Sequence, residues 1–212
     1  MRCLRSTPPR LALVAAILLA MTAGAEAHHP MGGETPQTFW HGFLSGLGHP
    51  VIGPDHLAFI VAIGIAAGLI GQRGLGLAAA FIAASSAGVL LHVAKLNVPM
   101  AEPLVALSVI VAGALLALDH ATRRPVWLGL AAVAGLLHGY AFGEAVVGAE
   151  RSVIGAYLIG IALVTTLIAW AFQYLTQQFA ALEIGPNRRI RAAGGMLGCI
   201  GVVMLVGSLL AA

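Results

Sequence analysis

The stretch from Gly46 to His56 holds the residues of this chain best suited to binding a metal. Within eleven residues it contains two histidines, one aspartate, two prolines and three glycines. Imidazole and carboxylate together suit borderline first-row cations such as Ni²⁺, Co²⁺, Zn²⁺ or Cu²⁺, and they suit Mg²⁺ or Ca²⁺ poorly. An apolar run, Leu57 to Ile70, follows at once. Since ionisable side chains beside a membrane-like run are costly, His49, Asp55 and His56 are candidate metal-binding residues.

The composition indicates an all-α, polytopic membrane protein with short loops. Of 212 residues, 59% are hydrophobic and 9% charged, whereas a soluble domain carries about 25% charged residues. The net charge of +3 is scattered, so nucleic acid is not an expected partner. No G-x-x-x-x-G-K-[ST] motif is present, so neither is a nucleotide. The two cysteines, Cys3 and Cys199, form no thiolate cluster for a soft metal.

Residues 1–27 predict a signal peptide. Three arginines precede an apolar run of 11 residues, Leu11 to Met21, and Ala25-Glu26-Ala27 is a small-x-small cleavage site. The alternative is an uncleaved first membrane helix. Cleavage leaves residues 28–35 as an N-terminal tail on the translocated side, which in a bacterium is the periplasm. His28, His29 and the new amine then either capture a divalent metal or belong to a plain polar tail.

Residues 36–212 predict a domain with six membrane spans, each needing about 20 apolar residues. The short helix-like segment Pro36–Gly48 precedes them, and we expect a half-helix that breaks at both His49-Pro50 and Gly53-Pro54. Broken helices of this kind mark binding sites in secondary transporters. The expected spans are Asp55–Gly71, Gly76–Val93, Pro103–Leu118, Val126–Phe142, Val153–Phe179 and Ile190–Leu210.

The arginines agree with the orientation that a signal peptide imposes. With the mature amino terminus outside, the inner loops and span ends hold six arginines, and the outer loops hold only Lys95 and Arg151. This bias satisfies the positive-inside rule and predicts a multi-pass protein of the bacterial inner membrane. Seven candidate metal-pathway residues then fall in the outer half of the membrane: His49, Asp55, His56, His92, Glu102, His138 and Glu144.

Each candidate also has a structural interpretation. Asp55 suits a helix N-cap, and Glu102 suits the start of a helix, where the dipole favours an acid. His92 suits a membrane interface. His138 and Glu144 are six residues apart and meet at one ion only if the helix unwinds at Gly139 and Gly143. The pairs we favour as a site are His49 with His56, and His138 with Glu144.

The remaining polar and aromatic residues have structural interpretations. The aromatic rings near the predicted span ends suit aromatic belts at the membrane surface. Four hydroxyls either line an inward path for the ion or bond to carbonyls of their own helix, and we expect the second. The aromatic residues are Trp40, Trp127, Tyr140 and Tyr157, and the hydroxyl residues are Ser85, Ser86, Thr165 and Thr166.

Two motifs resemble those of the HupE/UreJ family, membrane proteins encoded with nickel hydrogenases and ureases. The family pattern of His, five residues and Asp-His is met by His49, Asp55 and His56. Its pattern Phe-His-Gly-x-Ala/Val-x-Gly-Glu is met from His138 to Glu144, with Leu137 in place of Phe. The segments Glu102–Ser108 and His28–Gly33 are similar as well. The resemblance implies a secondary nickel or cobalt permease that serves hydrogenase or urease maturation.

From these observations we expect a non-enzymatic permease that moves Ni²⁺, or Co²⁺, from the periplasm to the cytoplasm. The metal is its substrate, and no prosthetic group is expected. The alternatives are a permease for another divalent metal such as copper, a membrane metal receptor or accessory protein that does not transport, and an intramembrane metalloenzyme. Against the enzyme, the sequence has no H-E-x-x-H motif. The oligomeric state, the coupling ion and the direct ligands among the candidates are left open.

Overall fold

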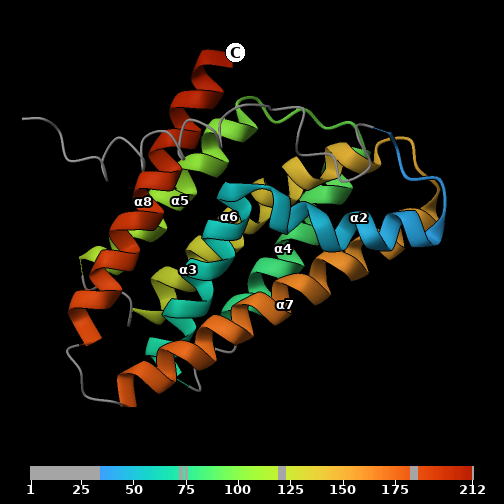
Figure 1. Cartoon of the computed structure of the whole chain (residues 1–212). Helices are drawn as coiled ribbons and strands as arrows, with labels where there is room; N and C mark the ends of the chain where they lie inside the picture. Colours follow the sequence, from blue (N-terminus) through green and yellow to red (C-terminus); the bar gives the residue numbers. More distant parts are fainter. Residues whose placement is uncertain (1–33, 72–73, 75, 119–122, 182–185, 212) are drawn as a thin grey trace, which may run out of the picture.

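The computed structural model describes residues 34–71, 74, 76–118, 123–181 and 186–211. These residues form helices and connecting turns, with no strand among them (Figure 1). The predicted signal peptide and the residues His28 and His29 lie outside the described residues. The elements are α2 (Phe39–Ile52), α3 (Pro54–Ile70), α4 (Gly76–Val93), α5 (Ala101–Ala117), α6 (Arg124–Gly143), the 3-10 helix η3 (Glu144–Val146), α7 (Arg151–Ala181) and α8 (Pro186–Ala211).

A single residue, Gly53, separates α2 from α3, and the two helices are bent by 80° there. Gly53 has extended backbone angles, φ −76° and ψ 111°, because a residue before proline is disfavoured in the helical region. Pro54 then starts α3, where its missing N–H costs nothing. The expected break at His49-Pro50 is wrong: α2 continues through Pro50 to Ile52.

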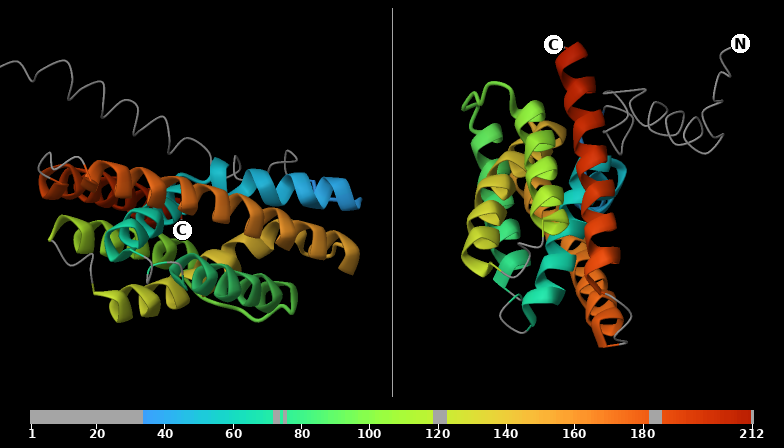
Figure 2. Two further views of the ribbon diagram at one scale, coloured as in Figure 1. Left: turned by 90° about the horizontal axis from the view of Figure 1, so that it is seen from below. Right: turned by 90° about the vertical axis from the view of Figure 1, so that its left-hand side faces the viewer.

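The helix α3 lies in the middle of the bundle and is apolar on all sides (Figure 1). It contacts α7 and α5 most extensively, and α8, α4 and α6 as well. A helix that is hydrophobic all round belongs in an interior, and the core formed with Phe59, Ile63 and Phe81 is fully or almost fully buried. Around α3, α4 packs along α6, α5 along α8, and α2 along α7. The helices α2 and α8 lie at opposite ends of one layer of the bundle, as the left view of Figure 2 shows.

Two glycines allow α2 and α7 to pack closely. A Cβ at Gly46 would overlap the carbonyl oxygen of Tyr157, and a Cβ at Gly160 would overlap that of Phe43. Without side chains at these positions the two backbones come into direct contact. The close packing fixes the last turn of α2, which carries His49, against the first turns of α7.

Four described helices, α4, α6, α7 and α8, are long and apolar enough to cross a membrane, and the bent pair α2–α3 makes a fifth if it forms one span. This count is below the six expected spans because α3 and α5 have only 17 residues each. At 1.5 Å per residue such a helix reaches about 25 Å, short of a hydrocarbon core of about 30 Å.

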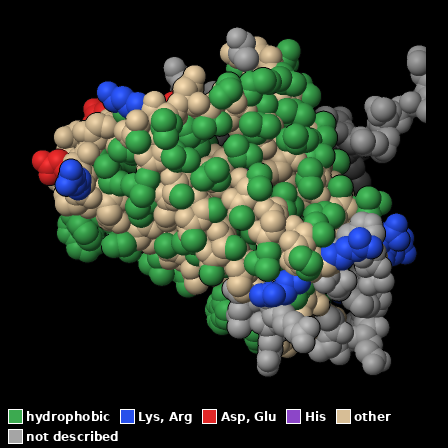
Figure 3. All heavy atoms as spheres, turned by 180° about the vertical axis from the view of Figure 1, so that it is seen from behind, with side chains coloured by type: hydrophobic (Ala, Val, Ile, Leu, Met, Phe, Trp, Pro, Cys, Tyr) green, Lys and Arg blue, Asp and Glu red, His purple; other side chains and the backbone are tan. Residues whose placement is uncertain are grey.

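On one face of the molecule the exposed charged side chains of the described residues lie near two opposite ends (Figure 3). On the face in Figure 3 a broad, largely hydrophobic surface separates them, and the charged side chains of described residues at one end are lysines or arginines. Of the acidic residues in the described ranges, Asp55 alone is buried, with 8% of its surface exposed. A hydrophobic band between charged ends is the surface expected of a membrane protein.

Candidate metal site at the helix break

Three histidines from three helices meet beside the break at Gly53. His49 comes from the last turn of α2, His56 from the first turn of α3, and His138 from α6. The ring centroids of His49 and His56 are 5.8 Å apart, and those of His56 and His138 are 4.9 Å apart. All three residues are buried. The bend brings the end of one helix and the start of the next together, so His49 and His56 become neighbours in space.

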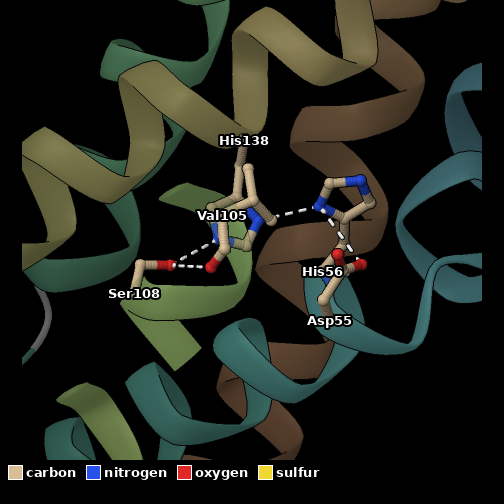
Figure 4. Close-up of polar contacts among 5 residues, drawn as sticks. All are labelled: Asp55, His56, Val105, Ser108 and His138. Atoms are coloured by element: carbon tan, nitrogen blue, oxygen red, sulfur yellow. Dashed lines mark hydrogen bonds and ion pairs between the residues drawn. The ribbon is translucent and has the colours of Figure 1, made fainter. Parts of the chain in front are cut away.

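A hydrogen bond joins the two histidines of α3 and α6. The Nδ1 atoms of His56 and His138 are 2.8 Å apart (Figure 4). Two protonated nitrogens cannot share such a contact, so one ring donates and the other accepts. Buried imidazoles that bond each other form a polar group inside an otherwise apolar bundle.

Asp55 supplies the carboxylate next to this pair. Its Oδ1 accepts a hydrogen bond from the backbone N–H of His56 at 2.8 Å and lies 3.8 Å from His56 Nδ1. The residue is in the first turn of α3, where the helix dipole favours a negative charge. The N-cap of α3 is Gly53, without a side-chain cap, so the expected N-cap role of Asp55 is wrong. Its carboxylate instead lies in the first turn, next to His56.

Two hydroxyl groups form hydrogen bonds with ring nitrogens of His138 and His49. Ser108 Oγ on α5 lies 2.9 Å from His138 Nε2 (Figure 4). The hydroxyl of Tyr157 on α7 lies 2.7 Å from His49 Nδ1. These two bonds connect the site to α5 and α7, so five helices contribute to it.

Aromatic rings form the walls of the site. Phe142 of α6 packs against His49 and His56, with ring centroids 5.1 Å and 4.4 Å away. On the other side, Phe59 and Phe81 stack on each other with centroids 5.4 Å apart, and both contact the ring of His138. These phenylalanines are fully buried, so the histidines are enclosed by apolar surface.

His92 lies outside this cluster and has a structural partner. Its Nδ1 is 2.7 Å from the carbonyl oxygen of Tyr140, and its ring packs on the Tyr140 ring with centroids 4.3 Å apart. A Cβ at Gly143 would lie 2.5 Å from the Cβ of His92, so the end of α4 packs tightly on the end of α6. His92 therefore ties α4 to α6.

The two glutamates are exposed and do not reach the histidines. Glu102 is in the first turn of α5, and Glu144 follows α6 in η3. The helix α6 does not unwind after His138 but continues through Gly139 to Gly143. His138 and Glu144 therefore stay apart, and the expected unwinding is absent. Across the described residues, no group of three or more His, Cys, Asp or Glu side chains is arranged to hold a metal ion.

Ser108 and Tyr157 were missed as site residues by the sequence reasoning. Ser108 closes the segment that resembles the family, which was a usable signal. Tyr157 was placed in an aromatic belt, as was Trp127, and for both that expectation is wrong because neither side chain is exposed. Trp40, with 67% of its surface exposed, remains compatible with a belt.

Two of the four hydroxyls bond to their own helix as expected. Ser86 donates to the carbonyl of Ile82, and Thr166 donates to that of Ala162. Ser85 and Thr165 are buried, and within the described structure their hydroxyls have no hydrogen-bond partner.

The fold and the site together define a polytopic helical membrane protein with a buried histidine cluster at a helix break. Residues 15–204 match the HupE / UreJ protein family, and the chain belongs to that family. It is similar to Protein HupE of Rhizobium leguminosarum bv. viciae, with 28% identity over 192 residues, which cover 89% of this chain and 94% of that protein. No solved structure matches the chain. The resemblance read from the histidine motifs is thereby confirmed.

Proposed function

We propose that this protein is a secondary permease that carries Ni²⁺, or Co²⁺, from the periplasm to the cytoplasm. One observation carries the proposal: His49, His56 and His138 converge with Asp55 inside the bundle, at the break of a helix. Ionisable groups at membrane depth are costly, and they recur where an ion binds or passes. Broken helices supply the same kind of site in other secondary transporters.

The donor set supports a borderline divalent cation as the substrate. Imidazole nitrogens and a carboxylate suit Ni²⁺, Co²⁺, Cu²⁺ and Zn²⁺. A thiolate would favour softer ions, but Cys199, the cysteine within the described residues, is exposed on α8. Membership of the HupE/UreJ family favours nickel among these metals, because the family resemblance implies a permease encoded with nickel enzymes.

Six spans and a periplasmic amino terminus complete the proposed topology. The helices α3 to α8 each cross the inner membrane, and α2 is a half-helix on the periplasmic side. The 17-residue helices α3 and α5 cross because the bilayer thins locally or flanking side chains reach its surface. Arg123, Arg124, Arg188 and Arg189 then lie at the cytoplasmic ends.

In this topology the ion first passes exposed glutamates on the periplasmic side. Packed aromatic side chains then block its way to the cytoplasm. Glu102 and Glu144 are exposed at the periplasmic ends of α5 and η3, where they attract cations. The stacked rings of Phe59 and Phe81 lie against His138 and close the way inward. The arrangement is therefore closed on its inner side.

The membrane potential is sufficient to drive uptake. A divalent cation moving inward gains about 4.6 kcal/mol per 100 mV, at about 2.3 kcal/mol per charge. Metal binding also displaces protons from imidazoles, so exchange of protons for metal is a second route to coupling.

Nickel uptake by cells tests the proposal. Replacing His56→Ala is expected to reduce uptake of radioactive nickel to the level of cells without the protein. The control is His41→Ala, which removes an exposed histidine of α2 and leaves the site intact. Normal uptake by the His56→Ala variant at normal expression contradicts the proposal, and metal binding without uptake identifies a receptor.

A further inference from the structure

We propose that the hydroxyls of Ser85 on α4 and Thr165 on α7 are further binding groups for the transported cation, supplying oxygen atoms to the ion and its bound water. The inference rests on the proposed function and adds donors from α4 and α7 to the imidazoles and the carboxylate. It is carried by the burial of the two hydroxyls, by their missing hydrogen-bond partners in the described structure and by their level in the bundle.

Both hydroxyls are buried without a partner. Ser85 and Thr165 each have 1% of their surface exposed, and within the described structure neither hydroxyl oxygen takes part in a hydrogen bond. The next residues, Ser86 and Thr166, show the ordinary alternative, since each donates to a carbonyl one turn back in its own helix. A buried hydroxyl that bonds to nothing is costly because its hydrogen bonds to water are lost. Two of them at membrane depth therefore point to a polar substrate.

Ser85 lies at the level of the histidine cluster, where two hydrophobic cores meet. On α4, Phe81 belongs to one core and Val89 to the other. Ser85 lies between them at a spacing of four residues, so the three share one helix face. Across from it, a Cβ at Gly139 would overlap the carbonyl of Ser85. The residue before Gly139 is His138, which is held by hydrogen bonds at both ring nitrogens (Figure 4).

Thr165 has the corresponding position on α7. It lies four residues after Ile161, which belongs to the same core as Val89. It lies four residues before Ala169, which belongs to the same core as Phe81. Each of the two hydroxyls is therefore at the boundary between the same two cores, in a layer that also holds the histidines.

The packing of α2 against α7 places Thr165 near the helix break. A Cβ at Gly42 would lie 2.5 Å from the carbonyl oxygen of Val153. One turn further along both helices, a Cβ at Gly46 would overlap the carbonyl oxygen of Tyr157. The two helices therefore run in the same direction and in register. Two more turns in this register bring Thr165 to the level where α2 ends and α3 begins.

Neutral oxygen donors suit an ion that must leave its site again. Serine and threonine hydroxyls ligate divalent cations, and they accept hydrogen bonds from water that a cation holds. Nickel and cobalt accept oxygen as well as nitrogen ligands. Because hydroxyls carry no charge, they add donors without holding the cation as tightly as further carboxylates would, and conduction requires binding weak enough for release.

The test measures nickel binding by calorimetry, together with the melting temperature, on the purified full chain. Ser85→Ala and Thr165→Val each remove one hydroxyl. The Kd for Ni²⁺ is expected to rise about tenfold in each variant. The melting temperature should equal or exceed that of the wild type, because an apolar group replaces a buried hydroxyl that bonds to nothing in the protein.

Thr165→Ser is the reciprocal variant. It keeps the hydroxyl and loses a buried methyl group, so it should bind nickel more tightly than Thr165→Val while melting at a lower temperature. Ser86→Ala and Thr166→Val are the matched controls. Each removes a hydroxyl that bonds to its own helix, and each should bind nickel with the wild-type Kd.

A wild-type Kd in both Ser85→Ala and Thr165→Val overturns the inference. Weaker binding accompanied by a lower melting temperature in both variants overturns it as well, because the hydroxyls would then support the fold. Nickel binding by the wild-type protein without flux into proteoliposomes contradicts the proposed permease instead, since the comparison of Kd values does not depend on flux.

Discussion

His56 and His138, 82 positions apart in the sequence, are joined by a hydrogen bond of 2.8 Å between their Nδ1 atoms. This bond links the first turn of α3 to α6, inside a bundle whose interior is otherwise mostly apolar. Burying this polar pair carries a desolvation cost that an apolar pair would avoid. The pair therefore indicates a functional role.

Replacing Gly53→Ala is expected to disable the site while the helices persist. A Cβ at Gly53 would lie 2.5 Å from Cδ2 of His56, so the imidazole must move. Its contact with His138 would be lost, and nickel uptake should fall about tenfold or more.

The control for this substitution is Gly155→Ala in α7. A Cβ there meets nothing within 4 Å, and alanine in a helix is favoured over glycine by about 1 kcal/mol. This variant should take up nickel at the wild-type rate with equal or higher thermal stability. Equal uptake by both variants would show that the position of the His56 ring is unimportant.

The three histidines are expected to respond differently to truncation. His49→Ala and His56→Ala each remove a ligand and should abolish saturable nickel binding, measured by calorimetry on the purified protein. His138→Ala removes only an orienting partner and should weaken binding by about 10- to 100-fold without abolishing it. Complete loss in His138→Ala, with the fold preserved, would place His138 among the ligands.

His92→Ala is expected to reduce stability and to leave the nickel KM unchanged. The substitution removes the hydrogen bond to the Tyr140 carbonyl and the ring contact between α4 and α6. The loss of one hydrogen bond should lower the free energy of unfolding by about 1 kcal/mol, visible as a lower melting temperature. A stable variant with a raised KM would instead assign His92 to the ion's path.

Glu144→Gln is expected to weaken nickel capture only at low ionic strength. The carboxylate is exposed and separate from the histidines, so its attraction for the cation is screened by salt. Uptake rates at limiting nickel should fall several-fold in dilute buffer and recover in high salt. Glu144→Asp keeps the charge and serves as the control. Loss of uptake at every salt concentration would make Glu144 a direct ligand.

Features that depend on residues adjacent in the sequence could be predicted. A glycine before Pro54 predicts a break, and a break between His49 and His56 predicts that they become neighbours. It misjudged the glycines of α6, where unwinding was expected near Gly139. There the missing side chain instead lets α4 pack against α6, since a Cβ at Gly139 would overlap the backbone of Ser85. A single sequence does not distinguish these two uses of glycine.

Contacts between distant helices were the least predictable part. Tyr157 and Trp127 lie near the ends of predicted spans, and position along a helix does not say which face a side chain occupies. The bond between Tyr157 and His49 depends on the packing of α2 against α7 through Gly46 and Gly160. Likewise, Ser108 could be recognised as a partner of His138 only once α5 and α6 were placed side by side.

Metal flux into proteoliposomes tests the central claim most directly. The purified chain is reconstituted with a metal-sensitive dye inside, a negative internal potential is imposed, and Ni²⁺ is added outside. We predict saturable flux that depends on the potential, at the wild-type rate for His41→Ala and at the rate of protein-free liposomes for His56→Ala. Nickel binding by the wild-type protein without any flux would contradict the assignment as a permease.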